Sequence, residues 1–359
     1  EKNKTNLHKV LFFSPKTTYR QTLNWSVNFF LGDGKNYSPG FGLPGTNYEI
    51  TTPYGEKKFR YLDMGENPPN GVIVNYFFES IPDNSLELIF FDAEGNEIIK
   101  FYDKDPIDGI KNGNEENDNQ KKHLSKKIGF NRFIWDMHYP GPKVEIDKSL
   151  EKISYKPLGK GEGSTNLGPT APPGRYKIQF KVGQKIFKHS FEILKDPRLL
   201  TNGKEFSAQF ELWTKIRDSV SDINFAINKI RSLNQQINEL LSRNNLNNND
   251  SEILIAIVLK SANTLRDKLT KIESQLVQNQ YETPSDRLRH PTMLKERMEA
   301  LVSVVSIADA APPLQANEVF NHLSKQINEK LSQLKIIENI DLKMLNKQII
   351  KAGIPRLEG

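Results

Sequence analysis

The sequence has 359 residues, no cysteine, and 50 lysine and arginine residues against 44 aspartate and glutamate residues, for a formal net charge of +6. This length is sufficient for two domains, and the absence of cysteine excludes disulfides, thiolate metal sites and cysteine nucleophiles. The positive charge is spread along the chain instead of being concentrated in one segment, which argues against nucleic-acid binding.

The N-terminal segment is charged and then aromatic. EKNKTNLHKVLFFSP lacks the apolar core of a signal peptide, and no later run approaches the ~20 apolar residues of a membrane-spanning helix. Residues 1–65 are rich in Gly and aromatic residues, and we predict an irregular strap there. Its aromatic side chains either pack along a neighbouring domain or form a platform on which sugars stack. The platform residues would be Trp25, Tyr37, Phe41, Tyr48 and Tyr54.

Residues 66–196 have period-two hydrophobicity, which predicts antiparallel strands. GVIVNYFFES is one strand. SLELIFFDAEGNEIIKFYD predicts a hairpin that turns near Gly95, and RYKIQFKVGQKIFKHSFEIL predicts a second hairpin that turns at Gly183. At least six such strands indicate an Ig-like antiparallel β-sandwich. Two polar stretches, residues 105–127 and 143–166, are too long for ordinary connections and are predicted to be insertions.

The segment FNRFIWDMHYPGP is the one that most resembles part of an active site. Its alternation predicts Trp135 in the core and Asp136 and His138 on the opposite face, with Pro140 ending the strand. A catalytic role for Asp136 would require a nucleophile in the same cleft, and no serine has the context of a nucleophile elbow. Asp136 is the catalytic candidate that we name, Glu87 is also conceivable as a catalytic carboxylate, and we assign no catalytic residue.

After Asp196 the apolar residues are spaced by three and four, which predicts a helical bundle over residues 197–359. One long helix is predicted over residues 206–240 and a second over residues 253–276. The asparagine-rich stretch SRNNLNNND separates them, because such runs favour turns over helix.

Prolines and caps predict the remaining helix ends. Pro291 and the Pro312–Pro313 pair each suit the first turn of a helix. A short last helix is predicted from an N-cap at Asp341 to a C-terminal Gly353. The fold class is therefore α+β and multidomain, with a sandwich followed by an antiparallel bundle.

The sequence contains no motif for a metal or a cofactor. The six histidines are scattered without ligand spacing, and no glycine-rich segment has the spacing of a phosphate-binding loop. Asp-box repeats, roughly Ser-x-Asp-x-Gly-x-x-Trp, are absent. We therefore expect no cofactor and no metal.

Several segments in one order resemble a known family. NPPNGVIVNYFF, LELIFFDAEGNEI, GFNRFIWDMHYPGP, GPTAPPGRYKIQFKVGQ, DPRL and QFELWTKIRDSVSDINFAINKIRSL are similar to the region that follows the β-propeller in large bacterial proteins with sortilin-like (VPS10-type) or BNR/Asp-box repeats. Those proteins are often described as glycosyl hydrolase-like. The resemblance continues through SDRLRHPTMLKERMEALVSVVSIADAAPPLQANEVFNHLSKQI and covers residues 60–355.

The resemblance implies a function and a location. It implies export to the periplasm, the cell surface or the medium, and an upstream β-propeller as the main partner. LFFSPKTTYRQ would be the chain leaving the last propeller blade. Any hydrolase site would lie in the propeller, so this chain is expected to be a non-catalytic accessory module that contacts domains or proteins.

Two alternatives stay open. One is a carbohydrate-binding module, and the other is part of a polysaccharide-acting glycoside hydrolase that uses Asp136. Further partners would be an envelope protein or a glycan, and neither nucleic acid nor a membrane span is expected.

Overall fold

The structure is a computed structural model. It describes residues 10–21, 34–38, 45–51, 57–62, 69–104, 123–143, 167–243, 252–280, 286, 288–353 and 355–357. Most of the two predicted insertions lies outside the described residues, as do Trp25, Phe41 and Tyr54.

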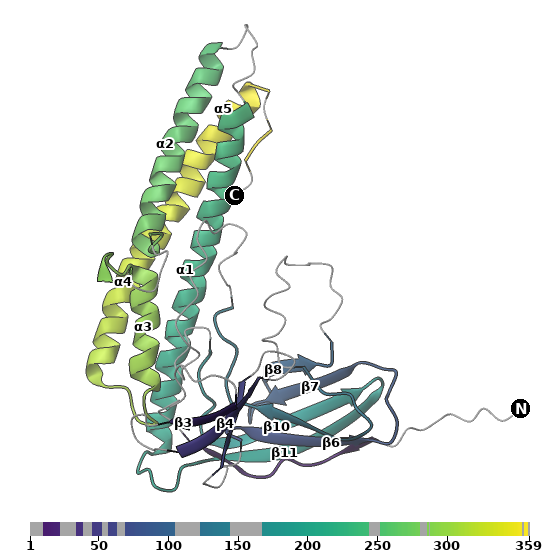
Figure 1. The fold of residues 1–359 in the computed structure, drawn as a ribbon. Coiled ribbons are helices and arrows are strands. Elements are labelled where there is room, and N and C mark those ends of the chain that lie inside the picture. The colour runs from purple at the N-terminus through teal and green to yellow at the C-terminus, as the bar shows by residue number, and fades with distance from the viewer. Residues whose placement is uncertain are drawn as a thin grey trace, which may run out of the picture. The chain divides into compact units, whose positions relative to one another are not determined.

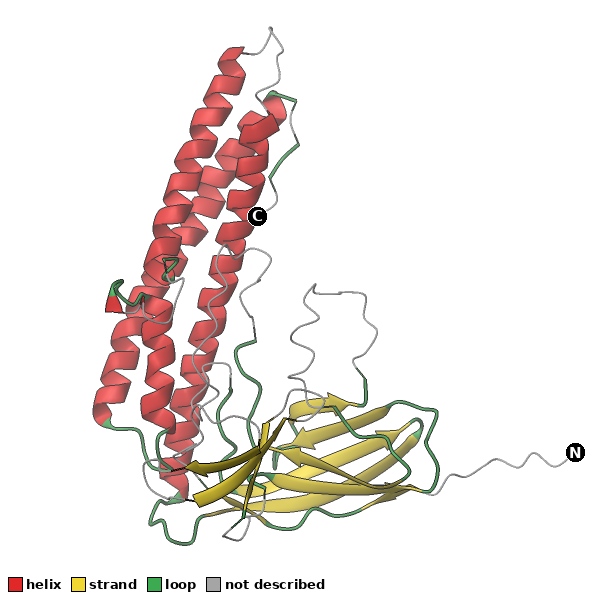
Figure 2. Ribbon diagram, in the orientation of Figure 1, coloured by secondary structure: helices red, strands yellow, loops and turns green. Residues whose placement is uncertain are grey.

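The chain divides into two compact units. The β unit contains residues 1–140, 170–210 and 308–310, and the helical unit contains residues 141–169, 211–307 and 311–359. Figure 2 shows that strands and helices occupy separate parts of the chain, so the fold is of the α+β class, as predicted.

Among its described residues the β unit has three sheets, and in Figure 1 their strands carry the purple to teal colours. The largest sheet is curled like half of a barrel. Its strand order is β2 (Thr18–Arg20), β11 (Lys185–Lys195), β10 (Gly174–Val182), β7 (Leu86–Phe91) and β8 (Glu97–Tyr102). A second sheet has the order β1 (Val10–Phe12), β6 (Val72–Phe78) and β9 (Gly129–Trp135). A third sheet has the order β3 (Gly34–Ser38), β4 (Gly45–Thr51) and β5 (Lys57–Tyr61).

Both predicted hairpins are confirmed. β7 pairs antiparallel with β8, and β10 pairs antiparallel with β11. In the first turn Gly95 has a φ of 99°, which glycine adopts without strain. The Asp92 carboxylate accepts hydrogen bonds from the backbone N–H groups of Gly95 and Asn96 at 2.8 and 2.7 Å. The turn is therefore closed by its own side chain.

The two larger sheets of the β unit share one hydrophobic core. Trp135 on β9 is fully buried, as predicted, and its ring centroid lies 4.4 Å from that of Phe90 on β7. The indole N–H donates to the backbone oxygen of His138 at 3.0 Å. Because the strand alternates, the inner residues fix which side chains of β9 face outward.

Two predictions about irregular segments are corrected by the structure. Residues 1–65, where we predicted a strap without regular elements, contain β1 and β2, which join the two larger sheets, and the three-stranded antiparallel sheet β3–β4–β5. Residues 123–127, predicted to belong to an insertion, are packed: Leu124 is buried, and its N–H donates to the Tyr102 oxygen at 2.8 Å. Composition alone misjudged both. Strand pairing stabilises the first segment, and the buried side chain of Leu124 anchors the second.

The helical unit is built from long amphipathic helices, which are green to yellow in Figure 1. They are α1 (Gly203–Arg243), α2 (Glu252–Leu276), α3 (Leu294–Ser306), α4 (Leu314–Ile336) and α5 (Lys343–Lys351). Most residues of the predicted apolar stripes are buried together in one cluster of this unit. The exceptions include Ile257 of the second stripe, which is 45% exposed. Among the described helices, none is long and apolar enough to cross a lipid bilayer.

The predicted helix ends are partly wrong. Asp341 is not an N-cap, because α4 continues into α5 through a π-helical turn, η4 (Ile337–Leu342). Pro291 precedes the N-cap Met293 of α3, and Pro313 is itself the N-cap of α4, so neither lies in a first turn. Gly353 follows the C-cap of α5 with a φ of 71°, as predicted for a C-terminal glycine.

A buried ion pair lies within the β unit. The Arg20 and Asp309 side chains are each 4% exposed, and the Arg20 Nη2 lies 2.6 Å from an Asp309 carboxylate oxygen. Arg20 also donates to Gln209 Oε1 at 2.6 Å and to the backbone oxygen of Ala171 at 3.1 Å. Burial lowers the pKa of Arg20, and the Asp309 charge opposes that shift. The pair joins strand β2 to residues 308–310.

Candidate interaction surface

The outer face of the sheet β1–β6–β9 carries apolar residues where a solvent-facing strand surface is normally polar. Leu11 lies opposite Phe77, and Phe77 lies opposite Phe130, so the three residues form one row across the sheet. The Phe13 ring stacks on that of Phe130, and Ile128 is exposed in the turn that leads into β9. We call these five residues, Leu11, Phe13, Phe77, Ile128 and Phe130, the apolar sheet face.

The apolar sheet face is exposed and aromatic. Phe130 is 77% exposed and Ile128 is 66% exposed. The Phe130 ring is stacked on that of Phe13 with centroids 6.0 Å apart, and it meets the Phe77 ring edge-on at 5.2 Å. The three rings therefore support one another while one side of the cluster faces solvent.

The turn that presents Ile128 and Phe130 is held by one buried amide. The Asn131 side chain accepts from the N–H of Lys127 at 3.0 Å and donates to the backbone oxygens of Lys127 and Gly129 at 2.8 and 3.1 Å. Gly129 has a φ of 88°, in the region that favours glycine. The sequence IGFN thus builds a closed turn that fixes two exposed apolar residues.

The inner face of the same sheet keeps this surface in place. Tyr76 on β6 is buried, and its hydroxyl donates to the backbone oxygen of Ser125 at 2.6 Å. Burial raises the pKa of Tyr76, so the hydroxyl stays protonated as a donor. Arg132 on β9 donates to the Asn75 side chain of β6 at 3.1 Å and forms a polar rim beside the apolar row.

The curled five-stranded sheet has an outer face of the opposite character. Glu87 on β7 lies between two lysines, with its carboxylate 2.9 Å from Lys181 Nζ and 4.0 Å from Lys100 Nζ. Lys177 of β10 is also exposed. Since both sheets contribute to one core, the contrast between their outer faces distinguishes β1–β6–β9 as the candidate interaction surface.

The predicted catalytic candidate makes a local contact with the backbone. Asp136 follows β9 directly, and its carboxylate accepts the backbone N–H of His138 at 3.3 Å. Within the described residues, no three His, Asp or Glu side chains are grouped as a metal site. Glu87, another carboxylate of the β unit, is engaged by its lysine partners. The hydrogen bond to His138 fixes the Asp136 side chain against the backbone that follows β9.

The predicted sugar platform is only partly described. Tyr37 lies on β3 and Tyr48 on the neighbouring β4, where Tyr37 pairs with Thr46 and Tyr48 with Lys35. These register positions lie on one face of the sheet. Tyr48 is 41% exposed. Trp25, Phe41 and Tyr54 lie outside the described residues.

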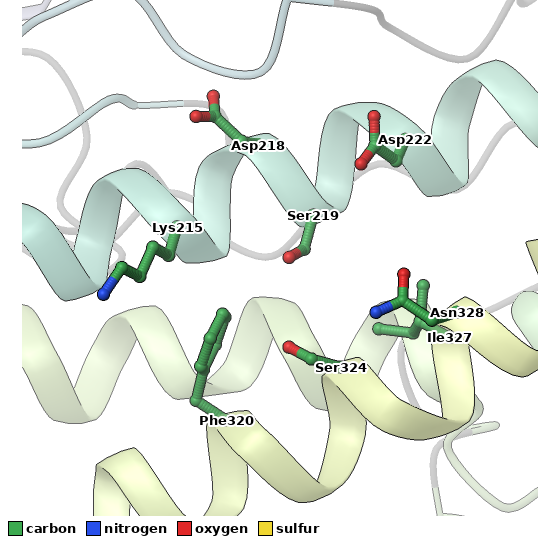
Figure 3. A pocket seen from close by; sticks show the side chains of 8 residues that line it. All are labelled: Lys215, Asp218, Ser219, Asp222, Phe320, Ser324, Ile327 and Asn328. Carbon is green, nitrogen blue, oxygen red and sulfur yellow. The ribbon is translucent and has the colours of Figure 1, made fainter.

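A shallow cavity of about 340 Å³ lies along α1 and α4 of the helical unit (Figure 3). Ser219, Phe320 and Ser324 are directed into the space between the two helices, whereas Asp218 points away from α4. Asp218 is paired with Arg217 at 2.7 Å. The polar groups therefore do not converge on a single point, and the cavity lacks the arrangement of a catalytic site.

Comparisons of the sequence with models of known protein families and with characterised proteins found no match. The resemblance to a post-propeller region therefore stays a prediction. Sequence reasoning had not selected the apolar sheet face, although a signal was present: YFF and GFNRFI place apolar residues on both faces of their strands.

Proposed function

We propose that this chain is a non-catalytic accessory module of an exported β-propeller protein, in which it mediates contacts between domains or proteins. In this proposal the two larger sheets of the β unit form an Ig-like sandwich, and the helical unit is an antiparallel bundle. The observation that carries the proposal is the exposed apolar sheet face. The resemblance to post-propeller regions supports the choice of partner and the export.

The physical argument is the burial of exposed apolar surface. Burying a Phe side chain is worth about 1.5–3 kcal/mol relative to leaving it in water, and Phe130 is 77% exposed. Its neighbours Phe13 and Phe77 hold the ring, so little side-chain entropy is lost when a partner covers it. Arg132 supplies a polar rim, which is typical of protein interfaces.

The contact is tested by placing a photo-crosslinking amino acid at position 130 of the native polypeptide in its source cell. We expect crosslinking to a β-propeller, in the same polypeptide or in an associated one, identified by mass spectrometry of the linked peptides. The same amino acid at position 186 is the matched control, because Ile186 is 55% exposed on β11 of the charged sheet.

The expected difference is several-fold more crosslinked product at position 130 than at position 186. Phe130→Asp should abolish the contact, since it would bury an unpaired carboxylate. Equal yields at the two positions would contradict the proposal, as would a native complex that survives Phe130→Asp unchanged.

Tyr48 favours carbohydrate binding as a second candidate function. It is 41% exposed on β4, where a sugar ring could stack on its face. If glycan binding occurs there, Tyr48→Ala should weaken it about tenfold, measured by calorimetric titration with cell-envelope glycans. Tyr19→Ala on β2 is the control, because Tyr19 is 48% exposed and lies in another sheet. Equal affinities for the Tyr48→Ala variant and the unmodified chain would remove this candidate.

A further inference from the structure

The last helical stretch of the chain has an exposed face with two parallel rows of different chemistry. Ile336, Ile340 and Met344, spaced by four residues, are 56%, 61% and 61% exposed. Residues at this spacing are neighbours along a helix surface. A row of exposed lysines runs beside them: Lys335, Lys343 and Lys347. We call these six residues the two-row face.

The π-helical turn η4 keeps the two rows on the same side of the helix. The buried residues that anchor this stretch are spaced by three, five, three and four: Leu334, Ile337, Leu342, Leu345 and Ile349. A spacing of five does not fit a regular α-helix, and η4 accommodates it with a wider turn. The buried face of the helix therefore stays on one side before and after η4. The exposed isoleucine, methionine and lysine residues stay on the opposite side.

The acidic residues of this stretch are already engaged inside the helical unit. Glu338 is paired with Lys229 of α1 at 3.1 Å, and Asp341 with Lys268 of α2 at 2.7 Å. Lys343 donates a hydrogen bond to the neutral side chain of Asn339 at 3.0 Å. None of the ion pairs formed among the described residues includes a lysine of the two-row face, which is therefore positively charged.

We propose that the two-row face binds an acidic amphipathic helix of a partner protein. An apolar row bordered by lysines is complementary to a helix whose apolar seam is bordered by glutamates, as in a coiled coil. The face spans about 18 Å between Lys335 and Lys347, the length of about three helical turns. Its exposed apolar residues are two isoleucines and a methionine, and none is a Trp, Phe or Leu, the residues through which helices that lie on membranes typically anchor. The chemistry therefore favours a protein helix over a lipid surface.

This inference concerns the helical unit and does not depend on the apolar sheet face. The probe is a synthetic peptide of about three heptads with Leu at the a and d positions and Glu at the e and g positions. It carries a fluorescent label, and its binding to the full chain is measured by fluorescence anisotropy. Vesicles of phosphatidylglycerol, assayed by co-sedimentation, test the lipid alternative.

We expect saturable binding of the acidic peptide that weakens as salt is added, because the ionic part is screened. Ile340→Ser and the double variant Lys343→Glu/Lys347→Glu should each weaken binding about tenfold or more. Val319→Ser on α4 and Lys204→Glu on α1 are matched controls at exposed positions outside the face, and both should stay within about twofold. A peptide with Lys in place of Glu should not bind.

Two results would overturn the proposal. One is that the acidic peptide does not bind. If the vesicles bind in its place, the face is assigned to anionic lipid. The other is peptide binding that the two face variants leave unchanged, which would place the contact elsewhere. Circular dichroism of each variant should match that of the unmodified chain, since all substituted side chains are exposed.

Discussion

Replacement of Arg20 by Met is expected to destabilise the β unit by about 3–5 kcal/mol. The Arg20 and Asp309 side chains are each 4% exposed, so removal of the guanidinium would leave a buried carboxylate without its cation. The second carboxylate oxygen of Asp309 already has no hydrogen-bond partner among the described residues. Gln209 and Ala171 would also lose a donor. Methionine fills similar volume, so the loss would report on charge and hydrogen bonding more than on packing.

Hydrogen exchange of the backbone amides in β10 and β11, followed by mass spectrometry, measures this loss. The exchange rates give the free energy needed to open the sheet. The control is the double variant Arg20→Met/Asp309→Leu, which removes both charges and should recover at least half of the loss. If the single variant exchanges no faster than the unmodified chain, the buried pair does not stabilise the unit.

Trp135→Ala is expected to destabilise the β unit by about 3–5 kcal/mol through the cavity that it leaves in the core. Trp135 is fully buried against Phe90, with Tyr176 and Phe191 at ring-centroid distances of 6.2 and 6.4 Å. The substitution also leaves the His138 oxygen without the indole donor.

Phe130→Ala is the matched control for Trp135→Ala. Both residues lie on β9, but Phe130 faces outward and is 77% exposed, so its loss should change stability by less than about 0.5 kcal/mol. Urea unfolding followed by far-ultraviolet circular dichroism gives both values. Equal losses for the two variants would mean that the apolar sheet face is covered by this chain itself.

The elements predicted best were those in which local preference and packing agree. The stripe from Phe206 to Leu240 repeats along one helix face, so α1 was found, and Trp135 was placed in the core by alternation alone. The start of α5 was missed because Asp341 resembles an N-cap, whereas packing against the core carries the helix through η4.

The candidate site was predicted less well than the fold. Aromatic residues in a glycine-rich segment drew attention to Tyr37 and Tyr48, while the outer row of exposed Leu11, half-buried Phe77 and exposed Phe130 went unnoticed. That row exists only through strand pairing between distant segments, and a single sequence gives the alternation of each strand but not its neighbours.

The Arg20–Asp309 pair has a consequence for how the protein is made. The two residues are 289 positions apart, so a growing chain exposes Arg20 long before its partner is synthesised. At ~5–20 residues per second the interval is about 15–60 s. During that interval the strands between Val10 and Lys195 can form, but the arginine lacks the carboxylate that neutralises it. The β unit is therefore expected to mature only after Asp309 has been synthesised, and chains truncated before residue 309 should be targets for chaperones and proteases.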